Sequence, residues 1–235
     1  MPVLPGSPPV EVHLKRSVRA RRFSLRVSRL DGKITLTLPA RARERDAMAF
    51  LQAQEGWLRE TLAAMPETGG VAVGPGMLLP VEGRLLRILP GAGRAVRVEG
   101  DALVVPGEPA QAGARVAAWL KALARDRLAR ASSEYAARVG RSYTRLTLRD
   151  TRSRWGSCSH DGALMYSWRL ILAPPSVLDY VAAHEVAHLV EMNHSAAYWA
   201  IVSRLYPGWR QERAWLHGHG QDLHRYRFGA GGSGA

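Results

Sequence analysis

One short segment restricts the fold of this chain more than any other part. Residues 184–194 read HEVAHLVEMNH, which places His184, Glu185, His188 and His194 close together. A spacing of four residues puts the first two imidazole rings on one face of an α-helix, one turn apart. His194 comes six residues after His188. If all three rings are to meet, the helix has to end near Met192 and the chain has to fold back.

The residues before this segment indicate how the helix is built. Pro174–Pro175 can precede a helix but not interrupt one, and Ser176 with Asp179 resembles a capping box. We therefore expect a helix from Ser176 to about Val190. On a helical wheel one side carries Val177, Val181, His184 and His188, and the other carries Leu178, Ala182, Val186 and Leu189. An apolar back and a histidine front are typical of a buried helix that presents a site.

The residue types at these positions indicate metal chemistry. Three histidine nitrogens leave the fourth tetrahedral position of a zinc ion open, which is the arrangement of catalytic rather than structural zinc sites. Zinc lowers the pKa of its bound water toward about 7. Glu185 points about 100° away from His184 on a helix, so it can act as general base without being a ligand. The alternative is a helix whose histidines lie in the core or on the surface and bind no metal.

Elsewhere the hydrophobic pattern switches between strand and helix periods. The first predicted elements are a β-hairpin of Phe23–Val27 and Ile34–Leu38 around Asp31–Gly32, and a helical stretch over 43–65 that is ended by Pro66 and Gly69–Gly70. Short strands over 71–106, with corners at EG and EGD, are followed by a long helix over 110–138 that ends near Gly140. A second hairpin built from 144–159 and 163–175 then leads into the histidine helix and a final helical stretch. Strands and helices cluster rather than alternate, which indicates an α+β fold.

Charge and cysteine content limit the class of protein. The formal net charge is +13, and residues 14–29 contain six arginines and one lysine. This stretch is either a solvated surface or a weak contact for nucleic acid or another polyanion. One cysteine permits no internal disulfide, and no apolar run is long enough to cross a membrane. With no signal-peptide pattern in the first residues, we expect a cytoplasmic location.

Three further features each allow more than one interpretation. Trp155 and Gly156 could lie beneath the site, with Gly156 permitting a close backbone approach, or could only pack a sheet. Cys158 could bind zinc, although a small buried thiol is the simpler interpretation. The last feature is a group of three histidines that could form a second metal site, supply a transition-state donor or lie on the surface: His217, His219 and His224.

Several blocks of the sequence resemble the YgjP-like metallopeptidase domains, which are related to SprT and WLM-type proteases. These blocks are RSRWGSCS at 152–159, WRLILAPPSVLDYV at 168–181 and HEVAHLVEMNHSAAYWAIV at 184–202. The resemblance covers about residues 11–222. It implies a zincin-like core, a twisted mixed sheet packed on an HExxH active-site helix, with one zinc bound by His184, His188 and His194 and with Glu185 as general base. Glu191 stands where metzincins have a glycine, which argues against that related group.

The resemblance also suggests how the chain is organised. We expect a flexible lead-in over 1–10, an N-terminal β-rich region with one helix over 11–108 that is integrated with the core, a zincin-like metallohydrolase core over 109–225 and a disordered tail over 226–235.

Four functions compete at this point. The first is a zinc metallopeptidase acting on a peptide or protein. The second is a UTP-type nucleotide pyrophosphatase, which the family resemblance and the charge suggest, although no Gly-rich phosphate loop is present. The third is a nucleic-acid-associated protease like SprT, although no recognised DNA-binding module is present. The fourth is a non-catalytic binding protein, which the presence of Glu185 disfavours. The sequence predicts no oligomeric state.

Overall fold

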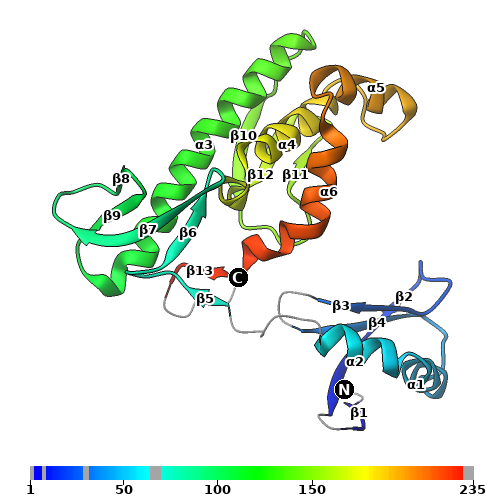
Figure 1. The fold of residues 1–235 in the computed structure, drawn as a ribbon. Coiled ribbons are helices and arrows are strands. Elements are labelled where there is room, and N and C mark those ends of the chain that lie inside the picture. Colours follow the sequence, from blue (N-terminus) through cyan, green and yellow to red (C-terminus); the bar gives the residue numbers. More distant parts are fainter. Residues whose placement is uncertain (1–2, 7–8, 29–31, 64–69, 230–235) are drawn as a thin grey trace. The chain divides into compact units, whose positions relative to one another are not determined.

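The computed structural model describes residues 3–6, 9–28, 32–63 and 70–229, and it divides the chain into two compact units, 1–69 and 70–235. Each unit is described by itself (Figure 1). The division falls after Gly69, within the region over 11–108 that we expected to be integrated with the core. The short strands over 71–106 therefore belong to the unit that carries the histidine helix.

The first unit is a four-stranded sheet with two helices. Its strands are β1 (Val3–Leu4), β2 (Val10–Ser17), β3 (Ser24–Val27) and β4 (Ile34–Pro39), in the order β1-β2-β4-β3. The predicted hairpin is confirmed, because β3 and β4 are antiparallel with Val27 opposite Ile34. Its turn residue Asp31 lies outside the described residues. The parallel pairing of β2 with β4 was not predicted, and β1 lies inside the stretch that we expected to be a flexible lead-in.

The predicted helical stretch of this unit is divided in two. Helix α1 (Glu44–Ala53) is followed by α2 (Glu55–Ala63), and Gln54 between them leaves the helical conformation at φ −102° and ψ 7°. Leu36 of the sheet and Leu51 and Leu58 of the helices are fully buried. Together they form a core made of residues of this unit alone. The terminating Pro66 and Gly69 lie outside the described residues.

The second unit begins with small sheets. Strands β6 (Leu78–Val81), β7 (Arg84–Gly91), β8 (Arg97–Glu99) and β9 (Ala102–Pro106) have the order β6-β7-β9-β8. Both predicted corners are tight antiparallel turns. Glu82 and Gly83 have positive φ at the first, and Gly100 has positive φ at the second. Strands β5 (Val71–Ala72) and β13 (Tyr226–Arg227) pair in parallel, so part of the predicted disordered tail is ordered. Residues 230–235 lie outside the described residues.

The long helix and the second sheet form the middle of this unit. After the short 3₁₀ helix η1 (Pro109–Gln111), α3 (Ala112–Arg138) ends just before Gly140, as predicted. The sheet has the order β10-β12-β11, with β10 (Arg145–Arg149), β11 (Gly156–Cys158) and β12 (Ala163–Ser167). Only β11 and β12 form the predicted hairpin. Strand β10 pairs with β12 in parallel, and the residues after β12 form a short 3₁₀ helix, η2 (Trp168–Leu172).

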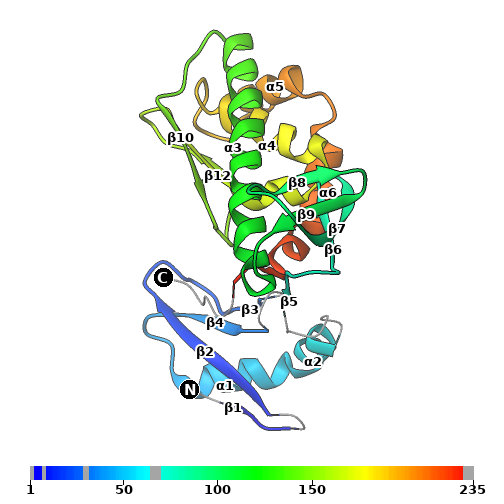
Figure 2. The same ribbon diagram turned by 90° about the vertical axis from the view of Figure 1, so that its left-hand side faces the viewer.

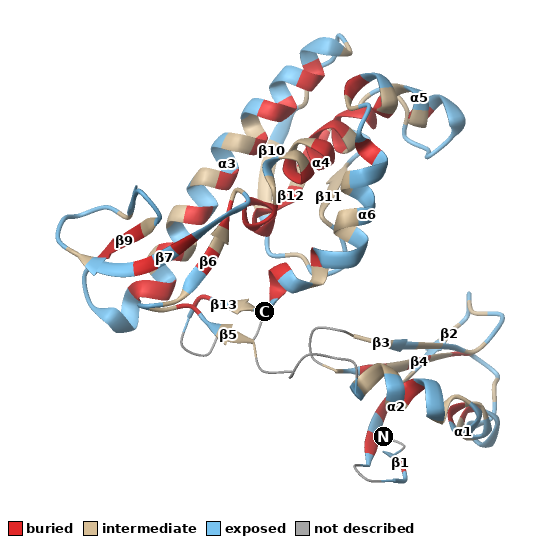
Figure 3. Cartoon of the chain, viewed as in Figure 1, coloured by how far each residue is buried: buried red, intermediate tan, exposed pale blue. Residues whose placement is uncertain are grey.

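Helix α4 (Pro175–Ala187) lies between α3 and α6 in both ribbon views (Figures 1 and 2), and it contacts both helices and β11. It is followed by α5 (Ala196–Leu205), α6 (Trp209–His219) and the short 3₁₀ helix η3 (Gly220–His224). Figure 3 shows that α4 is buried over most of its length. Apolar residues on both of its faces are buried, among them Val177, Val181, Ala182 and Val186. In the described part of the chain, no helix is long and apolar enough to cross a membrane.

Candidate metal centre and its cleft

The histidine helix begins and ends earlier than we expected. Pro174 is its N-cap and Pro175 its first residue, and no side chain caps the first turn. The predicted capping box is therefore wrong: the hydroxyl of Ser176 donates instead to the Glu212 carboxylate of α6, at 3.1 Å. A proline at the first helical position needs no N–H partner, so it starts the helix without a polar cap.

At its other end, α4 stops at Ala187 and not near Val190, and His188 is the C-cap. The backbone N–H groups of Val190 and Glu191 both donate to the carbonyl of Ala187 at 3.1 Å. Glu191 keeps a negative φ, since Glu82 is the one non-glycine residue with positive φ in the described part of the chain. The turn that brings the chain back is thus made without a glycine.

The reversal brings His194 to the helix end. The Nε2 atoms of His184 and His194 are 3.3 Å apart, and one ligand atom from each of the three histidines lies within 4.8 Å of the other two. The ring Nδ1 of His188 lies 3.1 Å from the carbonyl of Glu191, to which it donates when it carries the proton. That hydrogen bond orients the ring and leaves Nε2 unprotonated. Among the described residues, this is the one group of His, Cys, Asp or Glu that could hold a metal ion.

Burial keeps two of these rings in the form that binds metals. It lowers the pKa of His184 to about 3, helped by the positive charges of His188, His194 and Arg213, and it also lowers the pKa of His188. A neutral imidazole has a free nitrogen lone pair, and a protonated one has none.

Glu185 lies beside the three histidines and is 6% exposed. Burial raises the pKa of its carboxyl to about 8, and the Arg154 charge and the Cys158 backbone N–H act against that rise. Gly156 of β11 packs directly on this carboxyl: a Cβ atom at Gly156 would be 2.5 Å from Glu185 Oε1. The sequence interpretation that placed Gly156 beneath the site is therefore confirmed.

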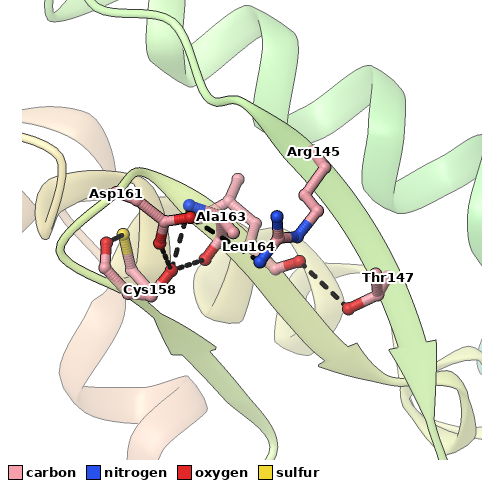
Figure 4. Close-up of polar contacts among 7 residues, drawn as sticks. Arg145, Thr147, Cys158, Asp161, Ala163 and Leu164 are labelled. Atoms are coloured by element: carbon pink, nitrogen blue, oxygen red, sulfur yellow. Dashed lines mark hydrogen bonds and ion pairs between the residues drawn. The ribbon is translucent and has the colours of Figure 1, made fainter.

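The hairpin that carries Gly156 is fastened at its turn. Ser159 both donates to and accepts from the backbone of Ala163, and it also donates to Asp161 (Figure 4). Asp161 in turn pairs with Arg145 of β10. Cys158 is half-buried and its Sγ donates to the Ser159 carbonyl, while burial raises the pKa of the thiol to about 11. Cys158 does not belong to the group of three histidines that could hold a metal ion.

Tyr198 belongs to the site, although we predicted no role for it. Its ring stacks on His188 with centroids 4.4 Å apart, and its hydroxyl donates to the backbone carbonyl of His184 at 3.0 Å. Ser195 caps α5 and accepts from the Tyr198 N–H, which fixes where that helix starts. The sequence signal that could have pointed to Tyr198 is the cap residue Ser195 in the stretch Asn-His-Ser-Ala-Ala-Tyr.

The three later histidines do not form a second metal site. His217 lines a cleft beside the metal centre, His219 lies 4.0 Å from Asp222, and the His224 ring stacks on Trp155 with centroids 5.1 Å apart. Nor is His224 at the surface, since it is buried. The cleft has a volume of about 820 Å³ and includes His184 and Glu185 in its wall.

Comparison with known proteins now decides the family. The model of the YgjP-like metallopeptidase domain matches residues 21–219, which is most of the chain and includes every residue of the site. The chain belongs to the YgjP-like metallopeptidase family. A YgjP-like metallopeptidase is a hydrolase that depends on a metal, and peptides or proteins are the substrates that the family implies.

Two other comparisons add little. A search of curated proteins found no match. The solved structure of the metallopeptidase zymogen abylysin from Pyrococcus abyssi is similar to this YgjP-like chain at 17% sequence identity. The match covers 40% of this chain and 93% of that chain, with a TM-score of 0.35. That TM-score is too low to establish a shared fold.

Proposed function

We propose that this protein is a zinc-dependent peptidase, with one zinc held by His184, His188 and His194 and with Glu185 as general base. The observation that carries the proposal is the 3.3 Å separation of the His184 and His194 Nε2 atoms. Two ring nitrogens at that distance need a proton or a cation between them. Two ligands of a tetrahedral zinc at about 2.1 Å from the metal lie about 3.4 Å apart, so the donor set fits this ion.

The surroundings of the three rings support the same assignment. The carbonyl of Glu191 orients His188, and the ring of Tyr198 packs against it. Such second-layer contacts fix ligand orientation and raise metal affinity. In our proposal α4, packed on the sheet of β10, β11 and β12, is the active-site helix of a zincin-like core.

Zinc, when bound, supplies Lewis-acid chemistry, since it polarises a carbonyl and lowers the pKa of water. The chain itself supplies the proton transfer. Glu185 lines the cleft but is largely shielded from solvent. Burial raises the pKa of its carboxyl toward neutral pH, which favours a group that both accepts and releases a proton. We assign it the transfer of a proton from the attacking water to the amine that leaves.

Metal analysis tests the ligands. The purified protein is expected to contain about one zinc per chain, and His188→Ala is expected to lose it. His219→Ala is the matched control, because His219 is exposed and does not belong to the group of three. Full zinc occupancy in His188→Ala would reject the ligand assignment.

A casein-type assay tests the base. Glu185→Gln is expected to keep its zinc and to lose hydrolysis by about 10²–10⁴-fold, the usual contribution of a general base. A Glu185→Gln protein as active as the wild type would reject the role of this residue. A zinc-loaded wild type that cleaves no peptide or protein would reject the peptidase proposal as a whole.

A further inference from the structure

The cleft beside the metal centre collects positive charge. Helix α6 contributes Arg210, Arg213 and His217, whose spacing of three and then four residues places them on one helix face. Arg154, just before β11, contributes a third guanidinium from another element. Arg154 and Arg213 line the same cleft wall as His184 and Glu185. The charges therefore lie beside the reacting groups.

No acidic side chain neutralises these arginines. In the described part of the chain, none of Arg154, Arg210 and Arg213 forms an ion pair, and Glu185 is the one carboxylate in the cleft wall. The two arginines of α6 rest on aromatic rings instead: Arg210 lies 4.6 Å from the ring centroid of Trp209, and Arg213 lies 5.3 Å from that of Trp199. Stacking of this kind holds a guanidinium in place and leaves its N–H donors free for a ligand.

A second hollow, which includes His188 in its wall, differs in charge. It is lined by His188, Leu189 and Met192 together with Arg141 and Asp161, so its basic and acidic groups are balanced. The excess of positive charge is thus confined to the side of the centre where Glu185, Trp155 and Tyr180 lie.

We propose that this cleft binds a carboxylate of the peptide substrate close to the bond that is cleaved, and that Arg154, Arg210 and Arg213 determine this specificity. The carboxylate is that of an acidic side chain or of the peptide's C-terminus. The inference rests on the proposed peptidase function, and it adds the substrate class. Guanidinium groups pair with carboxylates in a fixed fork geometry, and the aromatic wall accommodates the apolar part of the same residue.

The test uses the zinc-loaded full-length protein and alanine-rich peptides with an uncharged fluorophore and quencher. One set has blocked ends and carries Glu, Gln or Lys at a single position that is moved along the peptide. A second set has only neutral residues and either a free or an amidated C-terminus. Cleavage gives kcat/KM, and fluorescence anisotropy of the same peptides with Glu185→Gln gives binding that does not depend on cleavage.

Each exposed ion pair contributes a factor of up to about five, so we expect the preferred carboxylate peptide to exceed its uncharged analogue about tenfold in both readouts. The preference should shrink in high salt, because screening weakens exposed pairs. In the double variant Arg210→Gln/Arg213→Gln it should largely disappear, and in Arg213→Glu it should shift toward Lys peptides. Arg204→Gln on α5 removes the same charge outside the cleft and should keep the preference.

The outcomes separate the two proposals. Equal cleavage and binding of Glu, Gln and Lys peptides, with no effect of a free C-terminus, would overturn the specificity and leave the peptidase standing. Selective binding of carboxylate peptides without any cleavage would support the cleft assignment and reject the peptidase. A preference that survives in Arg210→Gln/Arg213→Gln would also overturn the assignment to these arginines.

Discussion

At the scale of single residues, the sequence predicted that three histidines come together because their spacing is local. His184 and His188 are one helical turn apart, and the sequence alone predicted that His194 returns to them. Gly156 and Tyr198 come from other elements, and their contacts with Glu185 and His188 depend on how β11 and α5 pack on α4. The arginines of the cleft meet for the same reason. Contacts of this kind leave no periodic signal within a single segment.

Gly156 offers a test of how Glu185 is positioned. Gly156→Ala places a methyl group 2.5 Å from Glu185 Oε1, which is closer than real Cβ contacts allow, so the carboxyl must shift. A displacement of about 1 Å in a reacting group can cost 10²-fold in rate, and we expect kcat to fall by about that factor while zinc content stays unchanged. Gly218→Ala on α6 is the control, because nothing lies within 4 Å of the added carbon. If both variants were equally active, the close approach would have no catalytic importance.

A substitution at Tyr198 can distinguish a role in holding the histidines from a role in packing alone. Tyr198→Phe keeps the ring on His188 and removes the hydroxyl that donates to the His184 carbonyl. We expect it to lower the free energy of unfolding by about 1 kcal/mol and to weaken zinc binding by roughly 10-fold, measured by denaturant titration and by competition with a chelator. Tyr143→Phe, whose hydroxyl pairs with Ser133 in an exposed position, should change neither quantity. Equal effects in the two variants would contradict a role at the metal centre.

At the scale of elements, the sequence predicted turns and long helices better than strand partners. The two-residue corner at Glu82–Gly83 and the end of α3 before Gly140 were predicted correctly, since both depend on a few adjacent residues. The parallel pairs β2–β4, β7–β9 and β10–β12 were missed. Alternation of apolar residues indicates a strand but does not say which strand lies beside it.

One ion pair joins the site's hairpin region to the end of the chain. Arg169 of η2 is buried, forms two hydrogen bonds with Asp150, and donates to the backbone carbonyls of Leu223 and Tyr226. Burial alone would raise the pKa of Asp150, but hydrogen bonds from Arg169 and its charge outweigh that and hold the pKa below the ordinary 3.8. This pair fixes η3, which in turn carries the ring stacked on Trp155.

The direction of that shift predicts how stability depends on pH. The folded-state pKa of Asp150 is lower than the unfolded-state pKa, so the pair stabilises the fold above the unfolded value and loses its effect as pH falls through the folded one. Because the Asp150 side chain is 47% exposed, the screened contribution is about 1 kcal/mol or less. The difference in unfolding free energy between wild type and Asp150→Asn should shrink as pH falls below about 4. A difference that stays constant in urea titrations down to low pH would contradict this.

At the scale of the whole molecule, the described residues form two hydrophobic cores that share no residue. One is formed by residues of 1–69 and the other by residues of 70–235. The sequence did not predict this division. It predicted that the whole β-rich region over 11–108 is integrated with the core. Strand β9 packs on α3, and burial of Leu103 and Val105 against Val116 and Leu120 joins these two elements into one unit.

Separate cores predict separate responses to metal. The three proposed zinc ligands, His184, His188 and His194, lie in the second unit. Zinc should therefore raise the unfolding temperature of that unit alone. At a zinc concentration about 1,000 times the dissociation constant the gain is about 4 kcal/mol, which corresponds to roughly 10 °C for a unit of this size. Calorimetry of the full chain with zinc or with chelator should show one transition that moves and one that does not, and His188→Ala should abolish the movement.

A substitution in the core of residues 1–69 tests the transition that zinc is not expected to shift. Leu51 of α1 is fully buried, and Leu51→Ala should cost about 2–5 kcal/mol through the cavity that it leaves. That loss should lower the unfolding temperature of the transition that zinc does not shift. It should not alter the temperature of the transition that zinc shifts. Because metal and cavity then act on different transitions, the two cores would be shown to unfold independently. If Leu51→Ala shifted the zinc-sensitive transition by the same amount, the two units would unfold as one cooperative body.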